Sequence, residues 1–364
     1  KKAAIKATED YGVGCVGSRF LNGTLDIHEE LEVKLAKFMK RESALVFSTG
    51  MLANFGVISG LVGKDDVIIT DKYDHASIID GCRLSYGSMK RFRHNDMKDL
   101  ERVMQSIKDG QGKLIVVDGV FSMEGDIANL PDIVDIAKKH NAHIMVDDAH
   151  GIGVLGKNGR GTAEHFGLEN EIDVVVGTFS KSFASVGGFI TASEDIIHYL
   201  KHNSRALIFT ASPSPSNVAS VIEALEIIKK EPERMQKLKQ IADMMRSEFQ
   251  KMGYDTGTSV TPIIPLLIGD NLKAFQMWRM LFDRGVFTTP VVSPAVPENR
   301  ALIRTSYMAT HSDEQLNRVL EVFEKVGKVL GVIAGSNGRR VKVQTSEDRV
   351  KTWMKRLWRF RSWR

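Results

Sequence analysis

Several features that would assign this chain of 364 residues to a particular class are missing from it. Its two cysteines, Cys15 and Cys82, are too few for the disulfide framework of a small secreted domain. No apolar run approaches the ~18 residues that a membrane-spanning helix needs, and the residues from Lys1 show no secretory leader pattern. The nucleotide-binding pattern G-x4-G-K-[ST] is also absent. The sequence therefore predicts a globular, cytoplasmic protein.

An excess of positive charge is missing outside the last part of the chain. Residues 335–364 hold ten Lys or Arg against two Asp or Glu, whereas the whole chain has a net charge of +5. Residues 1–334 are therefore mildly acidic, which argues against nucleic acid as a partner because phosphate backbones attract basic surfaces.

The basic segment 335–364 also holds three of the four tryptophans, Trp353, Trp358 and Trp363. Val350 and Met354 begin a helical spacing of apolar residues, which is typical of a basic amphipathic helix on an anionic membrane. Such a helix would give a peripheral membrane contact. The alternative is a disordered or appended tail after a linker-like break.

Short apolar runs alternate with helical patterns along the body of the chain. Asp26-x-x-Glu29 opens one helical pattern in the manner of a capping box, and Pro131 begins another. This alternation predicts an α/β fold with a mostly parallel sheet flanked by helices. We expect a large domain at 1–230, a smaller C-terminal α/β domain at 231–334 and the tail at 335–364. The expected strands are 44–48, 67–70, 114–117, 143–146 and 173–176.

Residues Gly12 to Gly17 spell G-x-G-x-x-G, which is a dinucleotide-binding pattern only between a strand and a helix. Here the preceding residues read as a helix and the following ones as turns, with the next helix starting near Asp26. The pattern therefore gives little support to a dehydrogenase or another nucleotide-binding module.

Polar residues follow the expected strands, at the edge where open α/β sheets bind ligands. The turn at 48–54 leads into a helix whose first N–H groups could hold a phosphate. Taken alone, His75 could be a capping or core histidine, and Lys181 a surface lysine. Asp147, Asp148 and His150 could bind a metal, but no acidic cluster elsewhere completes such a site, so we predict no metal. The residues after the later strands are Asp118 and Ser122, then Asp147 and His150, then Thr178, Ser180 and Lys181.

Four of these stretches together resemble the α-oxoamine synthases, which are pyridoxal 5′-phosphate (PLP) enzymes of the aspartate-aminotransferase fold type. The resemblance covers most of residues 1–332, in family order and at close to family spacing. It is carried by DHASIIDG, DGVFSMEGD, VDDAHGIGVLG and GTFSKSFASVGG. It implies a large PLP-binding domain and a smaller C-terminal domain.

The resemblance also implies roles for individual residues. Lys181 would form a Schiff base with PLP, and desolvation at a strand end would keep its amine reactive. Asp147 would pair with the pyridine nitrogen, which makes the ring an electron sink. His75 would stack on the ring, and His150 would hydrogen-bond its phenolic oxygen. The remaining cofactor contacts would come from Gly50, Met51, Thr178 and Ser180 at the phosphate, Asn54, Asp118 and Ser122 along the ring, and Ser212 at the phosphate of the partner subunit.

Arg304 would bind the carboxylate of an amino-acid substrate together with His75, because a planar guanidinium suits a carboxylate. By resemblance, the reaction joins an amino acid to an acyl-CoA with loss of CoA and CO2 in a homodimer with shared active sites. The stretches GSRFLNGTLDIHEELE and PVVSPAVP look most like bacterial members that convert L-serine and palmitoyl-CoA to 3-ketodihydrosphingosine. Other members use glycine with acetyl-CoA, or alanine with a pimeloyl thioester.

Two departures from the family pattern leave alternatives open. Members carry a leading segment before the position of Lys1, which predicts that this chain is truncated or built differently. Some members have a second arginine about a dozen residues before Arg304, where this chain reads VVSPAVP. A non-catalytic paralogue therefore remains an alternative, although the presence of Lys181 and Asp147 argues against it.

Overall fold

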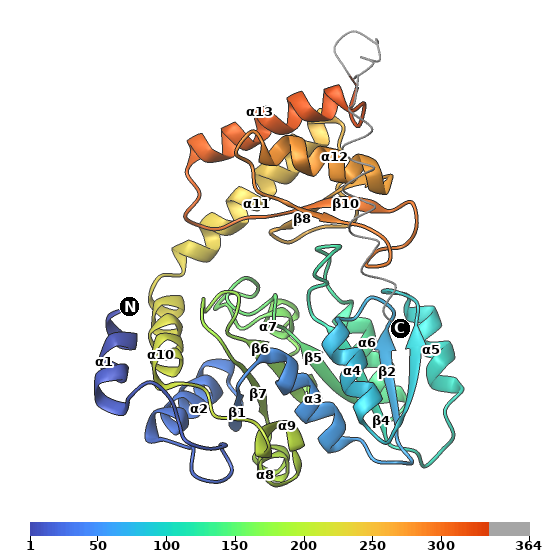
Figure 1. Ribbon diagram of the computed structural model, residues 1–364. Coiled ribbons are helices and arrows are strands. Elements are labelled where there is room, and N and C mark those ends of the chain that lie inside the picture. The colour runs from blue at the N-terminus through green and yellow to red at the C-terminus, as the bar shows by residue number, and fades with distance from the viewer. Residues whose placement is uncertain (335–364) are drawn as a thin grey trace, which may run out of the picture. The chain divides into compact units, whose positions relative to one another are not determined.

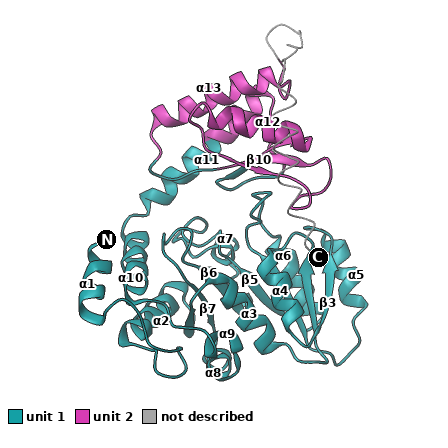
Figure 2. Cartoon of the chain, in the orientation of Figure 1, with its two compact units in different colours: residues 1–243, 258–264, 306–310 teal, residues 244–257, 265–305, 311–364 magenta. Residues whose placement is uncertain are grey.

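The computed structural model describes residues 1–334, so the basic segment 335–364 and its predicted membrane helix lie outside the described residues. The chain forms two compact units, coloured separately in Figure 2. Unit 1 comprises Lys1–Asp243, Thr258–Ile264 and Ser306–Thr310; unit 2 comprises Met244–Gly257, Pro265–Thr305 and, among the described residues, 311–334. This division falls later than the expected one between residues 230 and 231, and two short returning segments belong to unit 1.

Unit 1 is built on a seven-stranded sheet with the order β1-β7-β6-β5-β4-β2-β3. Neighbours from β6 to β3 run parallel, whereas β7 runs antiparallel to both β6 and β1. The α/β fold with a mostly parallel sheet is therefore confirmed. The strands are β1 Ser43–Phe47, β2 Val67–Asp71, β3 Ser88–Phe92, β4 Lys113–Asp118, β5 His143–Asp147, β6 Val174–Thr178 and β7 Gly188–Ala192.

Each of the five expected strands is present, with every end within two residues of its expected position. Sequence analysis missed β3 and β7. Strand β3 lies at the edge of the sheet and exposes most of its side chains, so it has no apolar run to detect. Strand β7 is buried, but it follows Gly187 directly and the glycines there read as a turn.

Helices cover both faces of this sheet (Figure 1). Successive strand residues point to opposite faces, so Val46 joins one buried apolar cluster while Leu45 and Phe47 join the other. The first cluster includes residues of α1 Lys2–Tyr11, α2 Asp26–Met39, α5 Met97–Gln105, α6 Leu130–Lys139 and α10 Pro215–Lys230. The second includes residues of α3 Gly50–Leu61, α4 Ala76–Leu84, α8 Glu194–Asn203 and α9 Arg205–Ile208.

The start of α2 differs from its predicted capping box. Leu25 is the N-cap, and its backbone N–H donates to Nδ1 of His28 at 3.0 Å. Asp26 instead accepts a hydrogen bond from the N–H of Ile27. His28 therefore takes the capping role expected of Glu29. The ring of His28 is buried and fixed in place, since its Nε2 lies 2.9 Å from the carbonyl of Pro213.

The division between the units falls within α11 (Glu233–Met252). Most of unit 2 is a three-stranded sheet of order β8-β10-β9 with two helices. Its aromatic core joins Phe249 and Phe323, whose ring centroids are 5.0 Å apart. No helix within residues 1–334 has the length and apolarity to cross a membrane. The further elements are α7 Thr162–Phe166 in unit 1, then β8 Ile263–Gly269, α12 Asn271–Phe282, β9 Thr289–Val291, β10 Ala301–Ser306 and α13 Asp313–Val329.

Candidate active site

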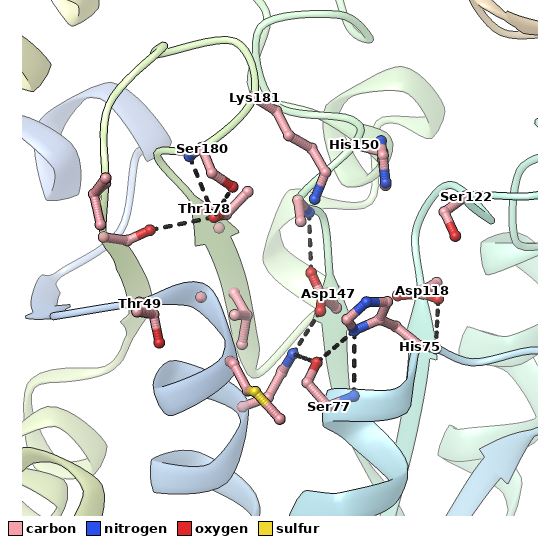
Figure 3. Close-up of a pocket in the computed structure, with 18 residues that line it drawn as sticks. Thr49, His75, Ser77, Asp118, Ser122, Asp147, His150, Thr178, Ser180 and Lys181 are labelled. Carbon is pink, nitrogen blue, oxygen red and sulfur yellow. Dashed lines mark hydrogen bonds between the residues drawn. The ribbon is translucent and has the colours of Figure 1, made fainter. Parts of the chain in front are cut away.

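A pocket of ≈ 360 Å³ lies in unit 1 at the edge where β1, β4, β5 and β6 end (Figure 3). The parallel sheet brings these strand ends together, although their residues are far apart in the chain. Eleven predicted site residues line the pocket: Gly50, Met51, Asn54, His75, Asp118, Ser122, Asp147, His150, Thr178, Ser180 and Lys181.

Lys181 and Asp147 enter the pocket from neighbouring strands. Lys181 follows the end of β6 and its side chain points into the pocket (Figure 3). Asp147 is the buried last residue of β5, and its two carboxylate oxygens accept hydrogen bonds from Asn54 Nδ2 at 2.6 Å and from the N–H of Ala149 at 3.0 Å. The pocket therefore has a primary amine and a fixed carboxylate. Lys181 is an exposed residue, and the desolvation of its amine stays a prediction.

His75 is the N-cap of α4 and is held on both its backbone and its ring. Its backbone N–H donates to Oδ2 of Asp118 at 2.9 Å. Its Nδ1 lies 2.7 Å from Oγ of Ser77 and accepts from the N–H of Ser77 at 3.2 Å. His75 does cap a helix, as one interpretation of the sequence had it, and it also faces the pocket.

The N-terminus of α3 forms a second end of the pocket. Thr49 caps the helix by accepting from the N–H of Leu52, and Gly50 and Met51 are its first helical residues. The first N–H groups of a helix have no partner inside it and attract anions. The hydroxyl of Thr178 lies beside this helix end, because a Cβ built at Gly50 would be 2.9 Å from its Oγ1. Oγ of Ser180 is 3.0 Å from the same Oγ1. This end of the pocket suits a phosphate.

Three buried carboxyl groups near these strand ends have a raised pKa, and one of them, Asp118, lines the pocket. Burial, and then the nearby charges of Asp147 and Asp74, raise the pKa of Asp118 well above its ordinary value. Burial and the charge of Asp71 do the same to the pKa of Asp74. Burial raises the pKa of Asp148 to about 7, against hydrogen bonds from Thr162 that lower it.

The metal and dinucleotide alternatives have no geometric support in unit 1. No group of three His, Cys, Asp or Glu side chains in residues 1–334 is arranged to hold a metal ion. The carboxylate of Asp148 does not line the pocket and accepts hydrogen bonds from Thr162 instead, at 2.5 Å from the backbone N and 2.7 Å from the hydroxyl of Thr162. Gly12 to Gly17 follow α1 in a loop, with neither a strand before them nor a helix within them.

Two predicted residues do not line this pocket. Ser212 donates its backbone N–H to the carbonyl of Gly17, and its buried Oγ has no hydrogen-bond partner among the described residues. Arg304 lies on β10 in unit 2, where burial lowers the pKa of its guanidinium. The roles of both residues stay predictions.

Some pocket residues were not singled out from the sequence. Thr49 and Ser77 act through helix capping and hydrogen bonding, and both lie within two residues of a predicted site residue. Only their closeness in sequence to Gly50 and His75 could have indicated them. Ala149, Val176, Gly177, Val186 and Gly187 line the pocket with backbone or small side chains and carry no signal of their own.

Comparisons with known proteins identify the family of the chain. The family model for aminotransferase class I and II matches residues 1–323. Serine palmitoyltransferase of Bacteroides ovatus is 50% identical over 332 residues, which are 91% of this chain and 84% of that protein. 8-Amino-7-oxononanoate synthase of Thermoanaerobacter pseudethanolicus is 47% identical over 334 residues, 92% of this chain and 85% of that protein.

A solved structure shares the fold. A single-residue variant of serine palmitoyltransferase from S. paucimobilis, with bound PLP–myriocin, superposes with a TM-score of 0.89 at 40% identity. The superposition covers 91% of this chain and 84% of the other. The chain belongs to the aminotransferase class I and II family and, within it, to the α-oxoamine synthases, which are PLP-dependent acyltransferases.

Proposed function

We propose that this protein condenses L-serine with palmitoyl-CoA and releases CoA, CO2 and 3-ketodihydrosphingosine. The carbon–carbon bond forms between Cα of serine and the acyl carbonyl as the thioester C–S bond breaks, and the serine carboxyl leaves as CO2. One observation carries the proposal: Lys181, Asp147, His75 and the N-terminus of α3 all line one pocket. The 50% identity to serine palmitoyltransferase supports the choice of substrates.

The donor set of the pocket fits PLP. A cavity of ≈ 360 Å³ is within the range of small-molecule sites. Oδ1 of Asn54 is buried there without a hydrogen-bond partner among the described residues, as expected for a group that faces a polar ligand. The amine, the buried carboxylate and the helix N-terminus match the aldehyde, the ring nitrogen and the phosphate of the cofactor.

Each polar residue then has a task. Lys181 offers the amine that binds the cofactor aldehyde, and it later takes the Cα proton of the amino acid. With PLP bound, Asp147 would keep the ring nitrogen protonated, His75 would cover one ring face and His150 would donate to the phenolic oxygen. Gly50 and Met51, by their N–H groups, and Thr178 and Ser180 hold the phosphate, while Asn54, Asp118 and Ser122 line the ring. Bound PLP supplies an electron sink that stabilises negative charge at Cα.

A second candidate is the 8-amino-7-oxononanoate synthase reaction, in which alanine is joined to a pimeloyl thioester. The 47% identity to one such enzyme favours it. Both reactions would use the same residues of the pocket. They differ in the amino acid and in the length of the acyl chain, so only the substrates distinguish them.

A substrate panel tests the proposal. The PLP-loaded protein is incubated with serine, glycine or alanine against acetyl-, pimeloyl- and palmitoyl-CoA, and products are identified by mass. We expect the serine–palmitoyl product and its loss in Lys181→Ala, with borohydride fixing PLP to Lys181 of the wild type. Products from alanine and pimeloyl-CoA alone would establish the second candidate. No product from any pair would support a non-catalytic paralogue.

We infer that the working form is a homodimer in which Ser212 reaches the phosphate in the partner's site. Apolar side chains left exposed on the two segments joined by the Ser212–Gly17 hydrogen bond support this inference, among them Val13 at 81%, Val16 at 87% and Phe209 at 72%. Light scattering of the purified protein measures the mass. A monomer with full activity would contradict the inference.

We also propose that the protein is cytoplasmic and that residues 335–364 contact membranes peripherally. Their excess of Lys and Arg and their tryptophans support the contact. Deleting 335–364 should abolish binding to anionic liposomes and leave the reaction with soluble substrates intact. Unchanged liposome binding would reject the proposal.

A further inference from the structure

The pocket contains a continuous chain of hydrogen bonds that none of the roles above requires. It runs from Asp147 through Asn54 and Ser77 to the imidazole of His75, and Figure 3 shows its labelled members Asp147, Ser77 and His75. Asn54 and Asp147 are 93 residues apart in the sequence, and Asn54 and Ser77 are 23 apart. We call Asp147, Asn54, Ser77 and His75 the relay.

The direction of each hydrogen bond follows from the chemistry of the groups. An ionised carboxylate only accepts, so the side-chain group of Asn54 that lies 2.6 Å from Oδ2 of Asp147 is the amide NH2. The second hydrogen of the same NH2 points to Oγ of Ser77, 2.8 Å away. Oγ of Ser77 therefore accepts a hydrogen bond from Asn54. The single hydroxyl hydrogen of Ser77 remains to be donated to Nδ1 of His75.

His75 receives two donors on one ring nitrogen. The hydroxyl of Ser77 lies 2.7 Å from Nδ1, and the backbone N–H of Ser77 lies 3.2 Å from the same atom. A proton on Nδ1 would point at the hydrogen of the Ser77 N–H, which already points at this nitrogen. Nδ1 is therefore the unprotonated nitrogen. The ring proton of the neutral imidazole then lies on Nε2.

We propose that Ser77 and Asn54 are positioning residues that fix His75 as its Nε2–H tautomer and tie that tautomer to the carboxylate of Asp147. The relay keeps Nδ1 occupied, so His75 meets a ligand with an N–H donor. A donor suits the oxygen atoms that the proposed reaction brings near it, which are those of the amino-acid carboxylate and the thioester carbonyl. This catalytic consequence rests on the proposed function, whereas the tautomer itself does not.

The relay is well placed to hold this geometry. Asn54 and Ser77 are 2% exposed and Asp147 is 5% exposed, so water does not compete for their hydrogen bonds. Asn54 belongs to α3, and Ser77 lies in the first turn of α4. Both helices pack on the same face of the sheet, which fixes the spacing of the relay.

Nitrogen NMR of the 15N-histidine-labelled, PLP-loaded protein tests the proposal, with the His75 signals assigned by their loss in His75→Gln. The wild type should show His75 as pure Nε2–H. Ser77→Ala should give a mixture of tautomers, and Ser77→Thr, which keeps the hydroxyl, should restore the wild-type pattern. Ser204→Ala is the matched control, because Ser204 is also buried, at 0% exposure, and does not line the pocket. If Ser77→Ala does not fold, Ser77→Cys offers a weak donor of similar size.

Kinetics give a second readout. Loss of one buried hydrogen bond should lower kcat/KM for the amino acid about two- to tenfold, mainly through KM. Ser77→Thr and Ser204→Ala should stay within about twofold of wild type. An Nδ1–H or imidazolium signal in the wild type, or an unchanged tautomer in Ser77→Ala, would overturn the proposal. The expected tautomers without any acyl transfer would support the relay and reject the proposed function.

Discussion

The carboxylate Oδ2 of Asp118 accepts a hydrogen bond from the backbone N–H of His75 at 2.9 Å, across 43 residues of sequence. The backbone N–H of Asp118 in turn donates to Oδ1 of Asp74, at 2.8 Å. These two bonds join the end of β4 to the loop before α4. They place the imidazole of His75 at the pocket through its backbone, independently of its ring contacts.

Asp118→Asn should stabilise the apoprotein at alkaline pH. The pKa of Asp118 in the folded chain is raised above its ordinary value of 3.8, mainly by burial, so this residue's contribution to stability is lost as pH rises through the folded value. Asparagine keeps an oxygen acceptor for His75 and does not titrate. We expect a gain of about 1 kcal/mol at pH 8 that disappears toward pH 4, measured by thermal unfolding. A gain that does not depend on pH would show that ionisation of Asp118 is not its cause.

Gly188→Ala should weaken PLP binding. A Cβ at Gly188 would lie 2.6 Å from Cα and 2.7 Å from N of Gly50, so the N-terminus of α3 would have to move away from the pocket. Overpacking of this kind costs about 1–3 kcal/mol of stability. We expect the Kd for PLP to rise about tenfold, measured by fluorescence titration.

The matched control for that substitution is Gly14→Ala, because no atom lies within 4 Å of a Cβ built there. Its Kd for PLP should stay within about twofold of wild type. Equal effects of the two substitutions would contradict a role for the contact between Gly188 and Gly50.

His94→Gln should destabilise unit 1 most strongly at neutral or lower pH. Burial would lower the pKa of His94, but hydrogen bonds to Asp126 at 3.1 Å and Asp71 at 3.0 Å outweigh it and raise the pKa to about 10. A histidine with a raised folded pKa contributes fully below its ordinary value of 6.5, and the contribution is lost as pH rises through 10. We expect the variant to lose about 2–4 kcal/mol at pH 6 and much less at pH 10.

Urea unfolding of the wild type and of His94→Gln at both pH values measures this difference. The exposed His143→Gln is the control, because the side chain of His143 is 75% exposed in its ion pair with Asp173. A loss in His94→Gln that is equal at pH 6 and pH 10 would show that the charge of His94 is not responsible.

Arg304→Lys should raise the KM for the amino acid by about tenfold or more while PLP binding is unchanged. Lysine keeps the charge but loses the two parallel N–H donors that match a carboxylate. Arg318→Lys, an exposed arginine on α13 of the same unit, should leave KM within about twofold. An unchanged KM in Arg304→Lys would remove Arg304 from the proposed substrate site.

The strand-end residues of the site were predictable because they depend on local sequence. Lys181, Asp147 and Asp118 each follow an apolar run, and parallel strands bring such positions to one edge. The relay was not predictable in this way. Its bonds depend on the distance between α3 and α4, and neither helix signals in its own sequence which residue of the other it meets.

By itself, the sequence determined the alternation of strands and helices, the polar residues that end the strands and the family to which the chain belongs. Local hydrophobic periodicity and turn chemistry carry that information. Only the tertiary structure decided that β7 runs antiparallel between β1 and β6, that Ser77 orients His75, and that Ser212 stays outside the pocket. These features arise from contacts between distant segments, whose energies depend on packing and hydrogen-bond distances that no single segment contains.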